Sequence, residues 1–151
     1  MKRLVKNGRK KKAAKKNISP YRSGLEAYCA KRLTEESIEF EYEKYSYTLQ
    51  ASFKGTQTYF KSVPKKLDLV DATGKTVLAI TYKPDFVSYK HKFIIETKGY
   101  VRSDDFPLRW KMFMRYCIEN GMEDWSLYIP KNSKQVEAVI HHIQNGLKQT
   151  I

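Results

Sequence analysis

Three stretches of the chain repeat hydrophobic residues with the spacing of an amphipathic helix: 21–37, 100–121 and 132–150. Ser103 is expected to cap the second helix, and Gly121 is expected to end it. The stripes that should face a core are Leu25, Cys29 and Leu33, then Trp110, Phe113, Met114 and Cys117, then Val136, Val139, Ile140, Ile143 and Leu147.

Strand-like patterns fill much of the region between the first two helices. Residues 38–50 alternate apolar and polar positions, but the phase slips by one residue between Tyr42 and Tyr45, which predicts a β-bulge or two strands. Their tyrosine row could stack on nucleic-acid bases or form a half-buried sheet face. Residues 51–66 are polar, basic and unpatterned, which predicts a loop or irregular insertion. Residues 67–82 hold two apolar runs around a turn sequence, which predicts a β-hairpin.

Residues 85–98 have the pattern of a second hairpin, with a four-residue loop at 89–92. That loop length places Asp85 opposite Glu96. Glu96 and Lys98 are two positions apart and share a face of their strand. All three side chains therefore meet on one face in this register, whereas a shift of one residue would scatter them.

These charged side chains predict a chemical site, because buried carboxylates are costly unless a cation or a proton offsets their charge. Asp85 and Glu96 offer hard oxygen ligands suited to Mg²⁺ or Mn²⁺, and the carbonyl of Thr97 can complete that set. Glu26 could reach across from the first helix and hold a second cation together with Asp85. Lys98 can orient or help deprotonate a water. Two such cations would stabilise the attacking and leaving oxygens of a phosphodiester hydrolysis.

Each of these assignments has a simpler alternative. Ser23 and Glu26 have the spacing of a capping box, and the pattern alone favours a Glu26 carboxylate that folds back onto the Ser23 amide. Glu96 and Lys98 could be an exposed ion pair after a turn-forming Pro-Asp dipeptide. The apolar run that directly precedes Glu96 favours the site.

The positive charge of the chain is concentrated at its N-terminus. The 151 residues carry a formal net charge of +13, with a pI near 9.7. Residues 1–20 hold nine Lys or Arg residues and no acid, whereas the rest holds 20 bases and 16 acids. We expect a disordered basic arm (1–20) that contacts nucleic-acid phosphates, followed by one domain (21–151); a solubilising or localising tail is the alternative. The candidate DNA contacts are Lys10, Lys11, Lys12, Lys15, Lys16, Arg22, Arg109 and Lys111.

The composition also bears on the compartment. No apolar run approaches the roughly 20 residues of a membrane span, and no apolar segment follows the N-terminal charges as in a secretory signal. Cys29 and Cys117 lie in apolar helical patterns, which favours buried free thiols over a disulfide. We therefore expect a cytoplasmic protein with no membrane partner.

Several short blocks carry a resemblance to a known family. They are YRSGLE at 21–26, YKPDF at 82–86, ETKG at 96–99 and SDD at 103–105. With these blocks the chain resembles the PD-(D/E)XK nuclease superfamily, and more closely the phage endonuclease I family of Holliday-junction resolvases. The resemblance places the family's active-site Glu on Glu26, its metal-binding Asp and Glu on Asp85 and Glu96, and its catalytic lysine on Lys98. It thus favours a functional role for Glu26 over a cap alone.

The resemblance implies an α/β fold with a restriction-endonuclease-like core, in which a central mixed sheet is flanked by helices. It also implies a Mg²⁺-dependent or Mn²⁺-dependent homodimer, with two cations per active site, that cuts branched DNA such as four-way junctions. The segment between Glu26 and Asp85 is enlarged relative to the family, which puts the family's exchange of segments between subunits in question. The alternatives are a related phage or mobile-element nuclease that nicks ordinary or mismatched duplex, and a non-catalytic nucleic-acid-binding protein.

Overall fold

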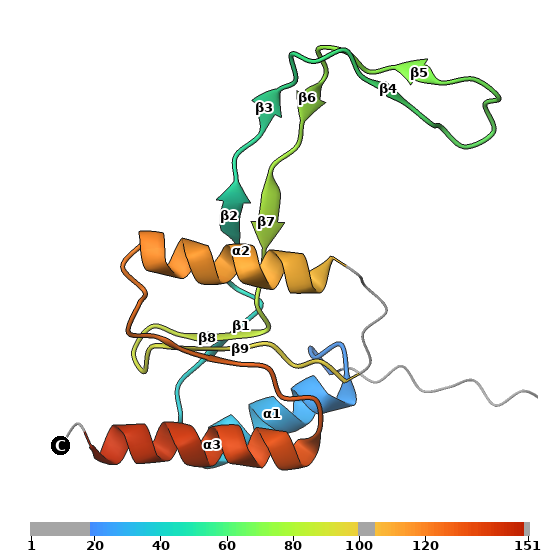
Figure 1. The fold of residues 1–151 in the computed structure, drawn as a ribbon. Coiled ribbons are helices and arrows are strands. Elements are labelled where there is room, and N and C mark those ends of the chain that lie inside the picture. The colour runs from blue at the N-terminus through green and yellow to red at the C-terminus, as the bar shows by residue number, and fades with distance from the viewer. Residues whose placement is uncertain (1–18, 100–104, 150–151) are drawn as a thin grey trace, which may run out of the picture.

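The computed structural model describes residues 19–99 and 105–149, and within them it contains three helices and a four-stranded mixed sheet. The sheet order is β1-β8-β9-β10; β8 is antiparallel to β1 and β9, and β10 runs parallel to β9. Helix α2 covers one face of the sheet, and α1 and α3 cover the other (Figure 1). The elements are α1 (Gly24–Glu35), α2 (Phe106–Glu119), α3 (Ser133–Lys148), β1 (Glu41–Tyr42), β8 (Phe86–Ser88), β9 (Phe93–Ile95) and β10 (Ser126–Tyr128). The expected mixed α/β fold is therefore confirmed.

The helices begin and end where local chemistry favours it. The Ser23 hydroxyl accepts a hydrogen bond in the first turn of α1, and the Asn132 side chain does the same for α3. Asp105 precedes α2 without a side-chain cap, and the expected cap Ser103 lies outside the described residues. Gly121 follows α2 with a φ of 72°, the left-handed conformation that glycine adopts at least cost. No helix in the described ranges is long and apolar enough to cross a bilayer.

The core lies on both faces of the sheet, because side chains alternate along each strand. Phe86, Phe93 and Ile95 pack against α1 and α3, whereas Val87 and Ile94 pack toward α2. All five are almost fully buried. The two strands of the hairpin therefore form the centre of the domain. The residues directly next to them in sequence, such as Asp85 and Glu96, are positioned by this core.

The expected helix stripes are largely confirmed. Cys29 and Cys117 are buried free thiols, and Phe113 is fully buried beside Cys117 on α2. The prediction that Met114 lies in the core is wrong, since this residue is 47% exposed. It lies at the edge of the stripe, and α2 buries only a narrow strip of its surface.

The register predicted for the hairpin is confirmed. Ser88 pairs with Phe93 and Phe86 pairs with Ile95, so that four residues form the loop. The same register places Asp85 and Glu96 opposite each other just beyond the paired residues.

A long two-stranded ribbon, residues 47–82, projects from the domain past α2 (Figure 1). Its elements are β2 (Tyr47–Gln50), β3 (Phe53–Lys54), β4 (Phe60–Lys61), β5 (Val70–Asp71), β6 (Thr76–Val77) and β7 (Ile80–Tyr82). They pair antiparallel as β2 with β7, β3 with β6, and β4 with β5. The prediction of two strands in 38–50 is thus confirmed. Most of residues 51–66 is irregular, as predicted, but the two short strands in this segment were missed. The hairpin predicted at 67–82 is wrong, because β5 and β6 pair with β4 and β3 and not with each other.

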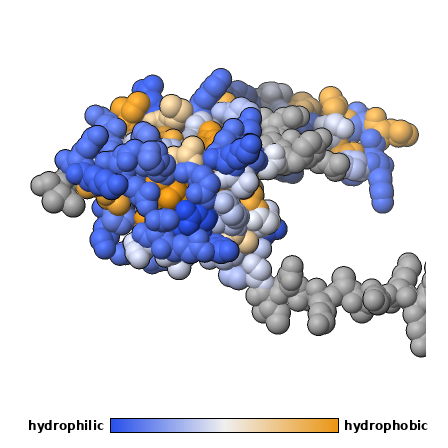
Figure 2. Space-filling view, turned by 90° about the horizontal axis from the view of Figure 1, so that it is seen from below, coloured by the Kyte–Doolittle hydropathy of each residue, from blue (hydrophilic) through white to orange (hydrophobic). Residues whose placement is uncertain are grey.

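The ribbon exposes large hydrophobic side chains. Leu67 is fully exposed, and Leu69 and Leu78 are at least 60% exposed. Figure 2 shows such side chains near the outer end of the ribbon, at the right of the view, while the domain seen from below is mostly hydrophilic. The exposed set in the ribbon is Phe53, Tyr59, Phe60, Leu67, Leu69, Val77 and Leu78. Exposed apolar groups that gather in one segment indicate an interaction surface.

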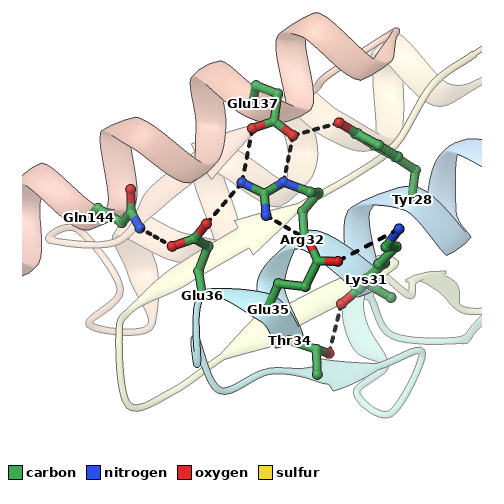
Figure 3. Close-up of polar contacts among 9 residues, drawn as sticks. Tyr28, Lys31, Arg32, Thr34, Glu35, Glu36, Glu137 and Gln144 are labelled. Atoms are coloured by element: carbon green, nitrogen blue, oxygen red, sulfur yellow. Dashed lines mark hydrogen bonds and ion pairs between the residues drawn. The ribbon is translucent and has the colours of Figure 1, made fainter.

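On the opposite side of the domain, a polar network joins α1 to α3 (Figure 3). Arg32 of α1 donates to Glu137 of α3 at 2.7 Å, and to Glu35 and Glu36 of its own helix region at 2.7 and 2.9 Å. The Tyr28 hydroxyl donates to the same Glu137 carboxylate at 2.6 Å. The network fixes α1 against α3, and α1 carries the candidate site residue Glu26.

Candidate active site

Glu96 and Lys98 lie together at the end of β9, beyond the last buried hydrophobic residue. Glu96 is only 4% exposed; its Oε1 lies 2.5 Å from Lys98 Nζ, and its Oε2 accepts a hydrogen bond from the Tyr82 hydroxyl at 2.6 Å. The backbone N–H groups of Glu96 and Lys98 donate to the carbonyls of Tyr128 and Pro130 at 2.9 Å. These bonds continue the parallel pairing with β10 and hold the charged pair in place.

Asp85 lies across from this pair, as the register requires. Its Oδ2 accepts hydrogen bonds from the backbone N–H of Thr97 at 2.7 Å and from the Thr97 hydroxyl at 2.6 Å. Burial, then the charge of Glu96, raise the pKa of Asp85 from 3.8 to about 6; Glu26 adds a smaller effect in the same direction, while the bonds from Thr97 act against it. Three acids therefore act on one another electrostatically at this end of the sheet.

Glu26 approaches from α1, on the other face of the sheet. It is 8% exposed, and its carboxylate accepts hydrogen bonds from the Ser23 hydroxyl and the Arg22 backbone N–H, both at 3.0 Å, and from the Tyr42 hydroxyl at 2.5 Å. The side chain thus takes part in a helix-start arrangement close to the expected capping box. Its contact with Tyr42 of β1 also points the carboxylate toward the sheet.

Two tyrosines, Tyr42 and Tyr82, are site residues that the sequence pattern did not single out. Each donates its phenol proton to one of the acids, Glu26 or Glu96. Burial first, together with the bond to its acid, raises the pKa of each phenol. Each phenol therefore stays protonated and acts as a hydrogen-bond donor to its acid. The available signal was that a tyrosine expected in a core needs a partner for its hydroxyl.

A cleft of about 250 Å³ opens beside Glu96 and Lys98. Lys83, Arg109 and Asp105 also line it, so that its charged lining, within the described residues, consists of three cations and two acids. Arg109 pairs with Asp105 at 3.5 Å. Such a lining suits an anionic substrate such as a phosphodiester.

The other expected DNA contacts are dispersed. Arg22 is 72% exposed and pairs with Glu43 at 3.0 Å, close to Glu26 in sequence. Lys111 lies on α2 and borders an apolar cavity that also includes Lys98. Lys10, Lys11, Lys12, Lys15 and Lys16 lie outside the described residues.

The carboxylates suit one hard divalent cation that keeps water and substrate among its ligands, and not a site in which protein groups supply every ligand. Within residues 19–99 and 105–149, no group of three or more His, Cys, Asp and Glu side chains is arranged to hold a metal ion. Mg²⁺ is commonly bound by one or two carboxylates, with water and substrate phosphates as its other ligands. Asp85 and Glu96 provide such a pair. The oxygens of Glu96 and Glu26 already have partners, which are Tyr82 and Lys98 for Glu96, and Ser23, Arg22 and Tyr42 for Glu26. A cation bound to either acid would therefore replace one of these contacts.

Thr97 can contribute to the same ligand set through its carbonyl. Its N–H points toward Asp85, and in extended backbone the carbonyl of a residue points to the same side as its N–H.

Comparison of the chain with protein-family models, with curated proteins and with solved structures found no match.

Proposed function

We propose that this chain is a divalent-metal-dependent DNA endonuclease, most specifically one that resolves branched DNA such as Holliday junctions. The observation that carries the proposal is the meeting of Asp85, Glu96 and Lys98 at one end of the central hairpin, where Glu96 and Lys98 line a cleft. Glu26 acts electrostatically on the same Asp85. The sequence blocks around these residues resemble the phage endonuclease I family, which supports a restriction-endonuclease-like core for this domain.

Each residue has a distinct part in the proposed reaction. Asp85 and Glu96, with the Thr97 carbonyl, would hold Mg²⁺ or Mn²⁺, which when bound polarises the phosphodiester and lowers the pKa of water. Lys98 orients the attacking water and offsets charge on the phosphoryl group. Tyr82 holds the Glu96 carboxylate in one orientation. A second cation, between Asp85 and Glu26, requires Glu26 to release part of its hydrogen bonds.

DNA and a second copy of the chain are the proposed partners. We propose that the basic arm (1–20), Arg22, Arg109 and Lys111 contact phosphates of the DNA, and of these Arg109 lines the cleft beside Glu96. The ribbon (47–82) supports a homodimer, because a monomer would leave its large hydrophobic side chains in water.

Two other functions compete with this one. A related nuclease that nicks ordinary or mismatched duplex would use the same residues, and only the substrate separates it from a resolvase. A non-catalytic nucleic-acid-binding protein would also need the cationic residues. However, a protein that only binds phosphates gains nothing from three acids that repel both one another and DNA.

The test is cleavage of a four-way junction and of a linear duplex of matched sequence, with Mg²⁺ or with EDTA. Paired symmetric nicks on the junction alone support a resolvase, and equal cutting of both supports the duplex nuclease. Glu96→Gln and Lys98→Met should abolish cleavage but leave DNA binding nearly intact. The matched controls are Glu39→Gln and Lys90→Met, because these residues form an exposed Glu–Lys pair elsewhere. A protein that binds DNA but cuts none of it with metal would be the non-catalytic binder.

A further inference from the structure

A cavity of about 520 Å³ adjoins the candidate site on its α2 side. Phe106, Trp110 and Met114 of α2 and Ile129 after β10 supply its apolar lining. This volume falls within the roughly 300–1,000 Å³ of typical ligand pockets. Met114 is 47% exposed here, although its position in the helix pattern predicts a buried residue. The cavity thus leaves a hydrophobic side chain of α2 facing open space.

Lys98 is shared by the cavity and the candidate site. Its Nζ lies 2.5 Å from Glu96 Oε1 and 4.3 Å from the centre of the Phe106 ring. Phe106 and Lys98 also line the cleft beside Glu96. A ligand in the cavity would therefore lie next to a phosphate positioned at Lys98.

The charge of the lining restricts the ligand. Lys98, Lys111 and Lys131 border the apolar surface, and no acid occurs among the described residues that line it. An apolar segment of protein has no need of three cations. A nucleotide matches both features, since its base has a flat aromatic face that stacks on apolar and aromatic side chains and its phosphates are anionic.

We infer that this cavity receives one unstacked nucleobase of the DNA, adjacent to the phosphodiester held at Asp85, Glu96 and Lys98. The inference rests on the proposed function and names how the substrate is selected. Stacking on aromatic side chains stabilises a base outside the helix, whereas removal of a paired base from a duplex costs its stacking and pairing. A base that is already unpaired avoids that cost. The cavity therefore favours DNA with unpaired or weakly stacked bases, as at a branch point, over regular duplex.

The experiment measures binding of the full chain, as the inactive Glu96→Gln variant, to four-way junctions that each carry one abasic nucleotide. The abasic position is moved through the residues that flank the cut site of the wild-type protein. We expect affinity to fall about 5-fold to 100-fold at one position and to change little at the others. A flat profile overturns the inference.

A variant of the cavity assigns the effect to it. Met114→Glu, combined with Glu96→Gln, should weaken binding to the intact junction more than to the junction that is abasic at the sensitive position. Ile118→Glu is the matched control, because Ile118 is an exposed apolar residue of the same helix that does not line the cavity. If Met114→Glu weakens binding to both junctions equally, the effect is only electrostatic and the inference is wrong.

The outcomes also separate this inference from the proposed function. If the protein cuts DNA with metal but the abasic profile is flat, the nucleobase site is refuted and the nuclease proposal stands. No cleavage of any DNA removes the nuclease and the inference that rests on it. If residues 100–104 or a second copy of the chain fill the cavity, the abasic profile is flat. Met114→Glu then changes the thermal stability or the oligomeric state instead, and this result overturns the inference.

Discussion

Asp85 is the residue whose replacement tests the electrostatics of the candidate site most directly. In Asp85→Asn the side chain keeps its size, and the amide oxygen can still accept the two hydrogen bonds from Thr97. What the substitution removes is a negative charge that is largely buried near Glu96 and Glu26. In the absence of metal, we therefore expect Asp85→Asn to be more stable than the wild-type protein at neutral pH.

The size of the effect follows from the pKa of Asp85, which rises from 3.8 to about 6 on folding. Because one pKa unit corresponds to 1.36 kcal/mol, the ionised side chain lowers the free energy of unfolding by about 3 kcal/mol at most. A change of 1 kcal/mol shifts the melting temperature of a domain of this size by about 2–4 °C. The variant should thus melt up to about 12 °C higher than the wild type at pH 8.

The sign fixes the pH dependence. Asp85 has a higher pKa in the folded state than in the unfolded state, so its protonation favours folding. That stabilisation is fully present below about pH 4 and is lost as the pH rises through about 6. The difference between Asp85→Asn and the wild type should therefore be near zero at pH 4 and largest above pH 7. Thermal or urea denaturation in EDTA from pH 4 to pH 8 measures it.

Asp124→Asn is the control of opposite sign. A hydrogen bond from Lys92 lowers the pKa of Asp124, so this exposed carboxylate should favour folding at neutral pH. Its replacement should leave the protein equally or slightly less stable at pH 8. If Asp85→Asn is less stable than the wild type at pH 8, or if its effect does not vary with pH, the buried-charge account of the site is refuted.

Three further predictions concern the contact between α1 and α3, the partner of Glu96, and the ribbon. Arg32→Met should lower the free energy of unfolding by about 1–3 kcal/mol in urea denaturation, because it removes charge-assisted hydrogen bonds between α1 and α3. Lys31→Met is the control, since Lys31 belongs to an exposed ion pair, and it should change the free energy of unfolding by less than about 0.5 kcal/mol. Tyr82→Phe should cost about 1–3 kcal/mol in the same assay, because it leaves the buried Glu96 carboxylate without one donor; a change below about 0.5 kcal/mol would count against that role. Replacement of residues 53–77 by a two-residue turn should leave thermal unfolding cooperative, because neither hydrophobic core cluster includes a residue of this segment. The same variant should be a monomer in light scattering where the wild-type protein is a dimer. A variant that stays dimeric would place the interface elsewhere.

Local chemistry in the sequence determined the helices and the central hairpin. Ser23 and Asn132 cap helices through contacts within a few residues, so a short window contains the needed information. The four-residue loop and the apolar run before Glu96 predicted the register that brings Asp85 and Glu96 together. A hairpin register depends on loop length and alternation, both of which are visible in the chain.

Tertiary structure alone decided the contacts between distant segments. The apolar runs in 67–82 were visible, but their partners in 51–66 were not, because strand pairing across a long ribbon depends on the whole segment and not on one turn. Likewise, nothing in the local pattern shows that Tyr42 donates to Glu26 or Tyr82 to Glu96. Periodicity indicates which face of an element is buried, whereas the packing of separate elements decides which groups meet there. The acids of this site were therefore predictable as residues, while their hydrogen-bond partners and the cavity beside Lys98 were not.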